Sequence, residues 1–163
     1  MDLRFVLISL YNTGMNATFT RVHELPENEQ KAVLNSAEAL HRQLRPKLPD
    51  DYVGYMQTMF KEGAGMFVMN DERLPVAIGV YRLHHTTFAG RRFYVDDLVT
   101  DEARRSRGFG KSLLAYLKEE AGRLAANVFT LESGTHRMEA HKFYFREGLV
   151  IPGFSFQTSL SPW

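Results

Sequence analysis

The chain has 163 residues, a hydrophobic fraction of 44% and a formal net charge of +1. These values indicate one ordinary globular domain with a real core, and neither a disordered chain nor a membrane protein. A near-neutral charge gives no reason to expect nucleic-acid binding. The absence of cysteine excludes disulfide frameworks, cysteine–zinc sites and a cysteine nucleophile, and it fits a reducing, cytoplasmic setting.

The sequence predicts a single domain behind a short N-terminal extension. Residues 1–16 are assigned to the extension, whose apolar run is too short for a membrane span and is followed by no small-residue cleavage site. Residues 17–163 contain no repeat and no linker rich in proline, glycine or serine. Because helical and strand patterns alternate along this stretch, we expect a mixed α/β domain.

Hydrophobic periodicity gives the elements in chain order. Apolar residues spaced by three or four indicate helices, and strict alternation indicates strands. Asp50 or Asp51 is expected to cap the second helix, and Gly148 to end the last one. The expected elements are a strand over 19–23, helices over 27–42 and 51–62, strands over 66–69, 76–83 and 93–100, a helix over 109–126, a strand over 128–132, a helix over 137–147 and a final strand over 154–158.

The strongest local pattern is the loop Arg105-Ser106-Arg107-Gly108-Phe109-Gly110, which stands between a strand and a helix. The first turn of a helix exposes backbone N–H groups and a partial positive charge, and glycines let the backbone approach a phosphate closely. The arginines and Lys111 add positive charge. The pattern therefore predicts an anion site, although a glycine-rich turn that merely starts a helix remains an alternative.

Two other phosphate motifs fit the loop poorly. A Walker A loop requires glycine where this chain has Arg105, although Gly110-Lys111-Ser112 looks like its end. The dinucleotide fingerprint requires a third glycine where this chain has Leu113.

Residues 94–117 resemble motif A of the GNAT superfamily, the acyl-CoA-dependent N-acyltransferases. The family pattern is arginine or glutamine, two residues, glycine, one residue, then glycine or alanine, and Arg105, Gly108 and Gly110 occupy those positions. Residues 131–149 resemble motif B, with Phe143-Tyr144 shortly before a glycine. The residues of this motif are similar to those of bacterial members that act on small molecules, including aminoalkylphosphonate acetyltransferases. A looser resemblance extends over residues 19–160.

The resemblance implies a mixed α/β fold with a central, mostly antiparallel sheet, splayed between its fourth and fifth strands and flanked by about four helices. It also implies acetyl-CoA as cosubstrate. Many members have asparagine where this chain has Arg137, and His141 is a further candidate for the cofactor groove. The residues expected to bind the cofactor are Leu98, Val99, Thr100, Arg105, Ser106, Arg107, Gly108, Phe109, Gly110, Lys111, Ser112, Arg137 and His141.

The implied reaction is attack of a neutral amine on the acetyl thioester. An amine of lysine type has a pKa of about 10.4, so the site needs a proton acceptor as well as a donor for the thiolate. Asp96 is predicted to be the base, directly or through a water, and Tyr144 resembles the family's general acid. The alternatives are that Asp96 and Asp97 pair with Arg91, Arg92 or helix residues, and that Tyr144 is a core aromatic.

The expected function is acetylation of a primary amine on a small molecule. Asp97 and Glu132 are assigned to the substrate side. Together with Asp96 they place carboxylates near the expected cleft, which favours a cationic acceptor. Arg137 and the aminoalkylphosphonate-like motif B favour the opposite, because an extra arginine could hold a phosphonate. Protein N-terminal or lysine acetylation and a non-catalytic acyl-CoA-binding module remain alternatives. Four of the six histidines, His84, His85, His136 and His141, stand near the expected site but show no ligand spacing, so no metal is expected. A homodimer is possible, and neither nucleic acid nor membrane is expected as a partner.

Overall fold

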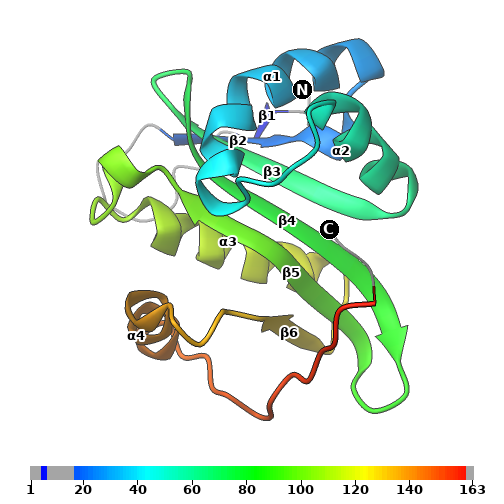
Figure 1. Ribbon diagram of the computed structural model, residues 1–163, viewed down its shortest axis with the longest axis vertical. Coiled ribbons are helices and arrows are strands. Elements are labelled where there is room, and N and C mark those ends of the chain that lie inside the picture. Colours follow the sequence, from blue (N-terminus) through cyan, green and yellow to red (C-terminus); the bar gives the residue numbers. More distant parts are fainter. Residues whose placement is uncertain (1–4, 7–16, 161–163) are drawn as a thin grey trace. The chain divides into compact units, whose positions relative to one another are not determined.

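The computed structural model describes residues 5–6 and 17–160, and the chain forms two compact units, within residues 1–130 and 131–163 (Figure 1). The elements of the first unit are β1 (Phe5–Val6), β2 (Ala17–Arg21), the 3-10 turn η1 (Val22–Glu24), α1 (Glu27–Leu44), α2 (Tyr52–Lys61), β3 (Ala64–Asp71), β4 (Leu74–Thr86), β5 (Gly90–Thr100), η2 (Glu102–Arg104), α3 (Phe109–Arg123) and the start of β6 (Val128–Leu131). The second unit contains α4 (Met138–Arg146).

The strands form one sheet in the order β1-β2-β3-β4-β5-β6. The four pairs from β1 to β5 are antiparallel, so the predicted, mostly antiparallel sheet is confirmed. In β1, Phe5 pairs with Thr20 and Val6 with Phe19. The rest of the predicted extension over residues 1–16 lies outside the described residues.

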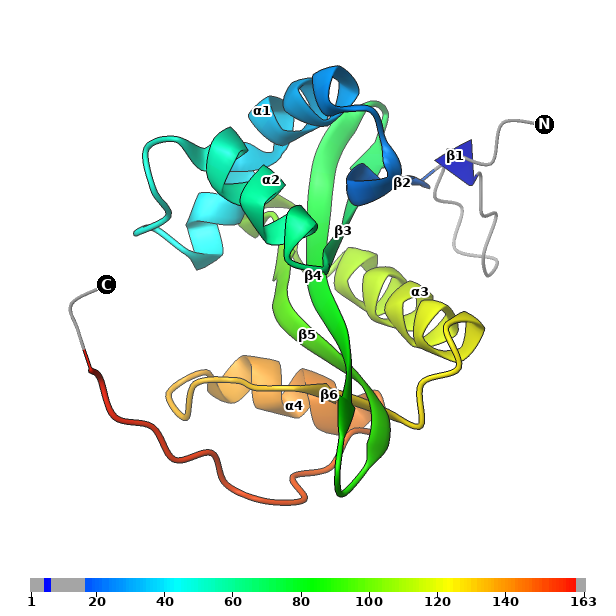
Figure 2. The ribbon, with the colours of Figure 1, turned by 90° about the vertical axis from the view of Figure 1, so that its right-hand side faces the viewer.

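Helices cover both faces of the sheet in the first unit, as Figure 2 shows for α1 and α2 on one side and α3 on the other. Leu34, Ala37 and Leu40 recur at helical spacing in α1 and are buried, which seats this helix on the sheet. Asp51 caps α2 by accepting a hydrogen bond from the Gly54 N–H at 3.0 Å. The core under α1 and α2 joins residues of η1, both helices and strands β3 to β5: Val22, Leu34, Ala37, Leu40, Tyr52, Met56, Met66, Val68, Ile78, Val80 and Val99.

The α3 face is built from stacked aromatic rings. Phe67 stacks on Tyr81 with ring centroids 5.6 Å apart, and Tyr81 stacks on Phe93 at 4.3 Å. Tyr116 of α3 meets the edge of the Phe67 ring at 4.9 Å and stacks on Phe19 at 4.1 Å. These rings fix α3, and with it the loop that precedes α3, against the centre of the sheet.

A buried ion pair lies beside these rings. Glu120 of α3 is only 3% exposed, and its carboxylate accepts hydrogen bonds from Arg21 at 3.0 Å and from Arg123 at 2.6 and 2.8 Å. The Arg21 guanidinium also lies over the rings of Phe67 and Tyr116. Burial opposes ionisation of Glu120, but the hydrogen bonds and charges of Arg123 and Arg21 outweigh it and hold its pKa below the ordinary value.

The second unit corrects one element prediction. Gly148 ends α4 with φ +81°, as predicted, but residues 151–160 form no strand, so the strand predicted over 154–158 is wrong. Phe154 and Phe156 are 87% and 94% exposed. Alternation describes which side chains share a face, whereas a strand also needs a neighbour for its backbone groups, and Pro152-Gly153 interrupts the approach to this segment.

Among the described residues, no helix has both the length and the apolar character needed to cross a membrane.

Candidate active site

A β-bulge interrupts β5 at its two aspartates. Val80 of β4 pairs with Asp97, whereas the next residue, Tyr81, pairs with Val95, so Asp96 is the extra residue. A bulge breaks the strict alternation of side chains between the two faces of a sheet. Two adjacent aspartates at this position therefore need not point in opposite directions.

At the bulge, the odd-numbered residues of β5 change from one face of the sheet to the other. Before it, Phe93 stacks on Tyr81 on the α3 side of the sheet, whereas after it Val99 belongs to the core under α1 and α2. Asp97 contacts α1, and Asp96 contacts Arg82, which lies two residues beyond Val80 on the α1 side. Strict alternation along a strand would place the two aspartates on opposite faces, but the bulge turns both toward α1.

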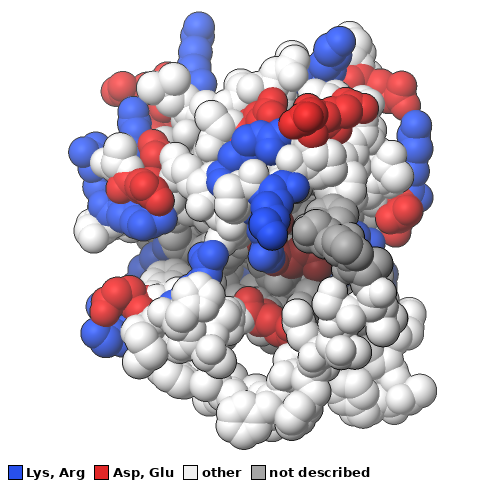
Figure 3. Space-filling view, in the orientation of Figure 1, with Lys and Arg blue, Asp and Glu red and all other residues white. Residues whose placement is uncertain are grey.

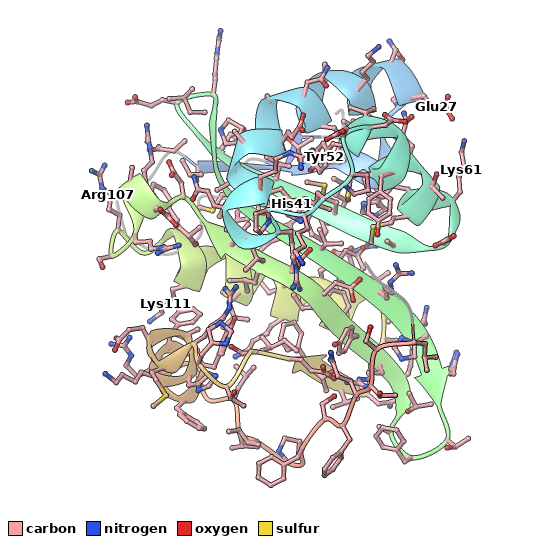
Figure 4. All side chains as sticks on the ribbon, in the orientation of Figure 1. Glu27, His41, Tyr52, Lys61, Arg107 and Lys111 are labelled. Atoms are coloured by element: carbon pink, nitrogen blue, oxygen red, sulfur yellow. The ribbon has the colours of Figure 1, made fainter. Side chains whose placement is uncertain are left out.

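Both oxygens of Asp97 are bound by residues from the end of α1. His41 Nε2 lies 2.9 Å from Oδ2, and Arg45 Nε donates to Oδ1 at 2.6 Å. The His41 ring is buried, and its Nδ1 lies 2.9 Å from the Tyr52 hydroxyl of α2. In Figure 4, His41 and Tyr52 lie together between the two helices and the sheet. We call these contacts the α1 latch: Tyr52 contacts His41, and both His41 and Arg45 contact Asp97.

The α1 latch makes Asp97 a positioning residue. Burial raises its pKa, but the hydrogen bond and charge of His41 and those of Arg45 prevail and hold the pKa below the ordinary value. Arg45 also donates to the backbone carbonyl of Asp96 at 3.1 Å, so one guanidinium ties both residues of the bulge. Both aspartates form ion pairs, as in the alternative given above. Asp97 pairs with Arg45 at the end of α1, and Asp96 pairs with Arg82 rather than with Arg91 or Arg92.

Asp96 keeps more exposure than Asp97 and has one engaged oxygen. Arg82 Nε donates to Oδ2 at 3.0 Å, whereas Oδ1 makes no hydrogen bond in the described part of the chain. Burial, with a smaller contribution from the Asp97 charge, raises the pKa of Asp96 above its ordinary value despite the opposing charge of Arg82. A half-buried carboxylate with a raised pKa and a vacant oxygen has the properties of a proton acceptor.

The last residues of β5 offer a strand edge. Leu98 and Val99 pair with Gly79 and Ile78 of β4 on one side. On the other side, Asn127 donates to the Arg91 carbonyl at 2.7 Å, so β6 begins beside the start of β5. Four residues reach only about 13 Å along a neighbour, which is less than half of the eleven-residue β5. β6 therefore cannot pair with Leu98, which agrees with the predicted splay between these two strands.

The base of the predicted phosphate loop is held on three sides. The Asp101 N–H donates to the Val76 carbonyl at 2.9 Å, and Gln43 of α1 bonds both the Asp101 carboxylate at 3.1 Å and the Glu102 N–H at 2.9 Å. Arg104 donates to Asp71 at 3.0 Å. The loop therefore leaves the sheet in a fixed direction.

The tip of the loop turns sharply twice. Ser106 and Gly108 both have left-handed φ values, +63° and +88°, and α3 begins directly after Gly108. Arg105 and Arg107 are exposed, and Figure 4 shows Arg107 at the tip and Lys111 at the first turn of α3. The first backbone N–H groups of a helix have no acceptor within the helix, so this end of α3 suits an anion.

The second unit holds the other predicted residues. Tyr144 lies in the last half of α4, where burial raises the pKa of its phenol against the opposing charge of Arg137. Its ring centroid is 5.4 Å from that of Phe143. Arg137 is the N-cap residue of α4, His141 Nε2 lies 3.0 Å from the Gly134 carbonyl, and Glu132 is exposed. A phenol that stays protonated at neutral pH is suited to donate a proton.

Neither a metal site nor the surface hollow between α1 and α2 adds to the candidate site in the described part of the chain. In the described part of the chain, no group of three histidine, aspartate or glutamate side chains is arranged to hold a metal ion. An open, polar hollow of about 450 Å³ lies between α1 and α2 and is lined in part by Lys31, Glu38 and Gln57. Because none of the predicted catalytic or cofactor residues lines the hollow, we assign it no role.

Sequence reasoning missed His41, Arg45, Tyr52 and Arg82. One signal for His41 was present, because it follows Leu34 and Ala37 at helical spacing and so places a polar ring in the apolar stripe of α1. The other three have side chains that look like ordinary surface or core residues in the sequence. Their role follows only from the fold.

A model of the GNAT family of acetyltransferases matches residues 31–148. An aminoalkylphosphonate N-acetyltransferase of Salmonella typhimurium is 34% identical over 80 residues, which cover 49% of this chain and 50% of that protein. The chain thus spans about half the length of the curated relatives it matches.

Two solved structures are similar in fold. The aminoglycoside N-acetyltransferase AAC(6')-Iy in complex with coenzyme A matches with a TM-score of 0.72 at 15% identity, over 93% of this chain and 100% of that one. A ribosomal-protein-alanine N-acetyltransferase from Brucella melitensis matches with a TM-score of 0.72 at 14% identity, over 89% and 99%. At these identities the likeness concerns the fold alone.

The family match covers both the loop before α3 and helix α4, where the two sequence motifs were recognised. The order of strands and helices agrees with the fold implied by those motifs. The chain therefore belongs to the GNAT family of acetyltransferases.

Proposed function

We propose that the protein transfers the acetyl group of acetyl-CoA to a primary amine of a small molecule. The observation that carries the proposal is the anchored loop at residues 101–110, which directly follows β5. The loop contains two residues with left-handed φ values, Ser106 and Gly108, and leads into the N-terminus of α3. The coenzyme A complex of a structural neighbour and the small-molecule acceptor of a relative support the same conclusion.

The residues of the loop fit the anionic half of coenzyme A. The exposed side chains of Arg105 and Arg107 supply positive charge, while Gly108 and Gly110 leave room for phosphate oxygens at the helix N-terminus. The backbone of Leu98–Thr100 supplies strand-edge donors and acceptors for the amides of the pantetheine arm. When bound, acetyl-CoA supplies the activated acyl group.

The proton transfers are assigned to Asp96 and Tyr144. Asp96 accepts a proton from the ammonium group of the acceptor, directly or through a water, through the oxygen that Arg82 leaves unbonded. Tyr144 donates its phenolic proton to the departing thiolate. Burial raises the pKa of this phenol, which favours the protonated form that a donor requires.

A thiol-release assay with a panel of primary amines tests the function. We expect stoichiometric release of coenzyme A with at least one small amine. Release only with peptides would establish protein acetylation instead. Binding of coenzyme A by calorimetry without thiol release from any amine or peptide would identify a non-catalytic binding module.

Replacing Gly108 by valine is expected to weaken acetyl-CoA binding by at least about tenfold. The substitution puts a branched side chain where the backbone must approach a phosphate, at a residue with φ +88°. Calorimetry on the folded variant measures the loss.

Gly63→Val is the matched control, because Gly63 has φ +90° and no heavy atom within 4 Å of an added Cβ. Both variants carry a similar backbone strain of about 1–2 kcal/mol, but only the change at Gly108 lies in the loop. Equal acetyl-CoA affinities in the two variants would show that strain alone explains the effect, and would remove the loop assignment.

A further inference from the structure

The outer half of the β4–β5 hairpin carries cationic and aromatic side chains on one face. His84 of β4 lies directly opposite Arg92 of β5, and Arg82 lies opposite Tyr94. Residues directly opposite in an antiparallel pair share a face, and so do alternate residues of one strand. Arg82, His84, Arg92 and Tyr94 therefore form a single surface, which we call the hairpin patch.

The hairpin patch lies on the side of the sheet that carries Asp96. Val80, two residues before Arg82, is part of the core under α1 and α2, so the patch continues that face toward the hairpin turn. The alternating residues Tyr81 and Phe93 stack on each other on the opposite face. Arg82 also bonds Asp96 directly, which makes the patch continuous with the proposed base.

Both arginines of the patch are held in place by their Nε atoms. Arg92 Nε donates to the Thr130 hydroxyl at 2.7 Å, and its guanidinium lies 4.6 Å from the centre of the Tyr94 ring. Arg82 Nε donates to Asp96. The terminal nitrogens of both side chains make no hydrogen bond to residues in the described part of the chain. Each guanidinium is thus oriented while its outer edge remains available for a bidentate contact with an oxyanion.

The local charge balance is positive. Asp96 and Asp97 are already bound to Arg82 and Arg45, whereas Arg92 has no carboxylate partner among the described residues. In Figure 3, acidic and basic side chains alternate over α1 and α2, so no broad field of one sign overrides this local balance. Two of the three carboxylates on which the expectation of a cationic acceptor rested, Asp96 and Asp97, are thus already paired with arginines.

We propose that the hairpin patch binds the oxyanion of an acceptor that carries both a primary amine and a phosphonate or phosphate group, with Arg92 and Arg82 as the principal contacts. The assignment rests on the proposed acetyl transfer. Asp96 lies two residues beyond Tyr94, which is about 7 Å along the strand. An amine at Asp96 and an oxyanion at the patch can therefore belong to one small molecule.

Calorimetry on the protein saturated with coenzyme A measures the patch without turnover, because the loop before α3 is already occupied. We expect 2-aminoethylphosphonate to bind the wild-type protein, and Arg92→Gln to weaken this binding by about tenfold or more. Arg92→Lys should fall between the two, since it keeps the charge but loses the planar fork. Arg91→Gln is the matched control: Arg91 pairs with His85 on the other face, and its variant should bind as the wild type does.

Thiol release then relates the patch to the reaction. The kcat/KM for 2-aminoethylphosphonate should exceed that for propylamine and for 1,3-diaminopropane, and Arg92→Gln should remove this advantage. A parallel series with 2-aminoethyl phosphate distinguishes a phosphonate from a phosphate ester.

The two measurements test the hairpin patch and the acetyl transfer independently. Absence of phosphonate binding, or equal affinity in the wild type and Arg92→Gln, overturns the patch even if propylamine is acetylated. Phosphonate binding that depends on Arg92, without thiol release from any amine, supports the patch as an anion site and overturns acetyl transfer.

Discussion

Replacing Tyr144 by phenylalanine is expected to lower turnover by about two to four orders of magnitude, the usual contribution of a positioned general acid. The substitution removes one oxygen atom and keeps the ring, so its packing beside Phe143 is preserved. Because the lost proton donor acts in the transition state, kcat should fall much more than the KM for acetyl-CoA rises. Steady-state thiol release measures both constants.

The matched control is Tyr116→Phe. The Tyr116 hydroxyl is buried and makes no hydrogen bond in the described part of the chain, so its removal should leave turnover unchanged. A Tyr144→Phe variant that keeps turnover within about twofold of wild type would assign Tyr144 to the core instead. The pH profile gives a second readout: burial raises the pKa of Tyr144, so the active, protonated form should persist to a higher pH than an ordinary phenol would allow.

Replacing Glu120 by alanine should destabilise the fold by about 3–5 kcal/mol, because it removes the buried carboxylate that Arg21 hydrogen-bonds and leaves only the more distant Glu24. The fall in the free energy of unfolding is measured by denaturant titration. Glu119→Ala, at the exposed neighbouring position of α3, should cost much less. A loss below about 1 kcal/mol for Glu120→Ala would show that the pair is dispensable.

The destabilisation should also depend on pH. The folded-state pKa of Glu120 is lowered, so its contribution is complete above the unfolded-state pKa of about 4.3 and is lost as the pH falls through the folded-state pKa. Wild type and Glu120→Gln should therefore differ most near neutral pH, and the difference should shrink in acid. A constant difference across this range would contradict the ion-pair explanation.

Most of the fold was predictable because it depends on local periodicity. Leu34, Ala37 and Leu40 mark the buried stripe of α1. Asp51 caps the start of α2 and Gly148 ends α4, as their residue types favour. The segment at Phe154–Phe156 failed because alternation does not specify a partner strand, and pairing is a property of the whole sheet.

The candidate site was predictable only where a motif is continuous in the sequence. The loop from Arg105 to Gly110 could be recognised, since its glycines and the helix after it are adjacent. The bulge at Asp96 could not, because an extra residue is defined only relative to the partner strand. The contacts of Asp97 likewise come from α1, 56 residues away from it at His41.

The α1 latch has a consequence for the order in which the chain acquires its structure. Strands β3, β4 and β5 follow one another along the chain and pair through short turns, so their association closes only small loops. His41 and Asp97 are 56 residues apart, and Arg21 and Glu120 are 99 apart, so both contacts require much longer loop closures. We expect the three-stranded meander to assemble before α1 docks. The contacts of His41 and Arg45 with Asp97 are then a late product of folding. A chain that has formed its meander alone would have both aspartates on one face without the partners that fix Asp97.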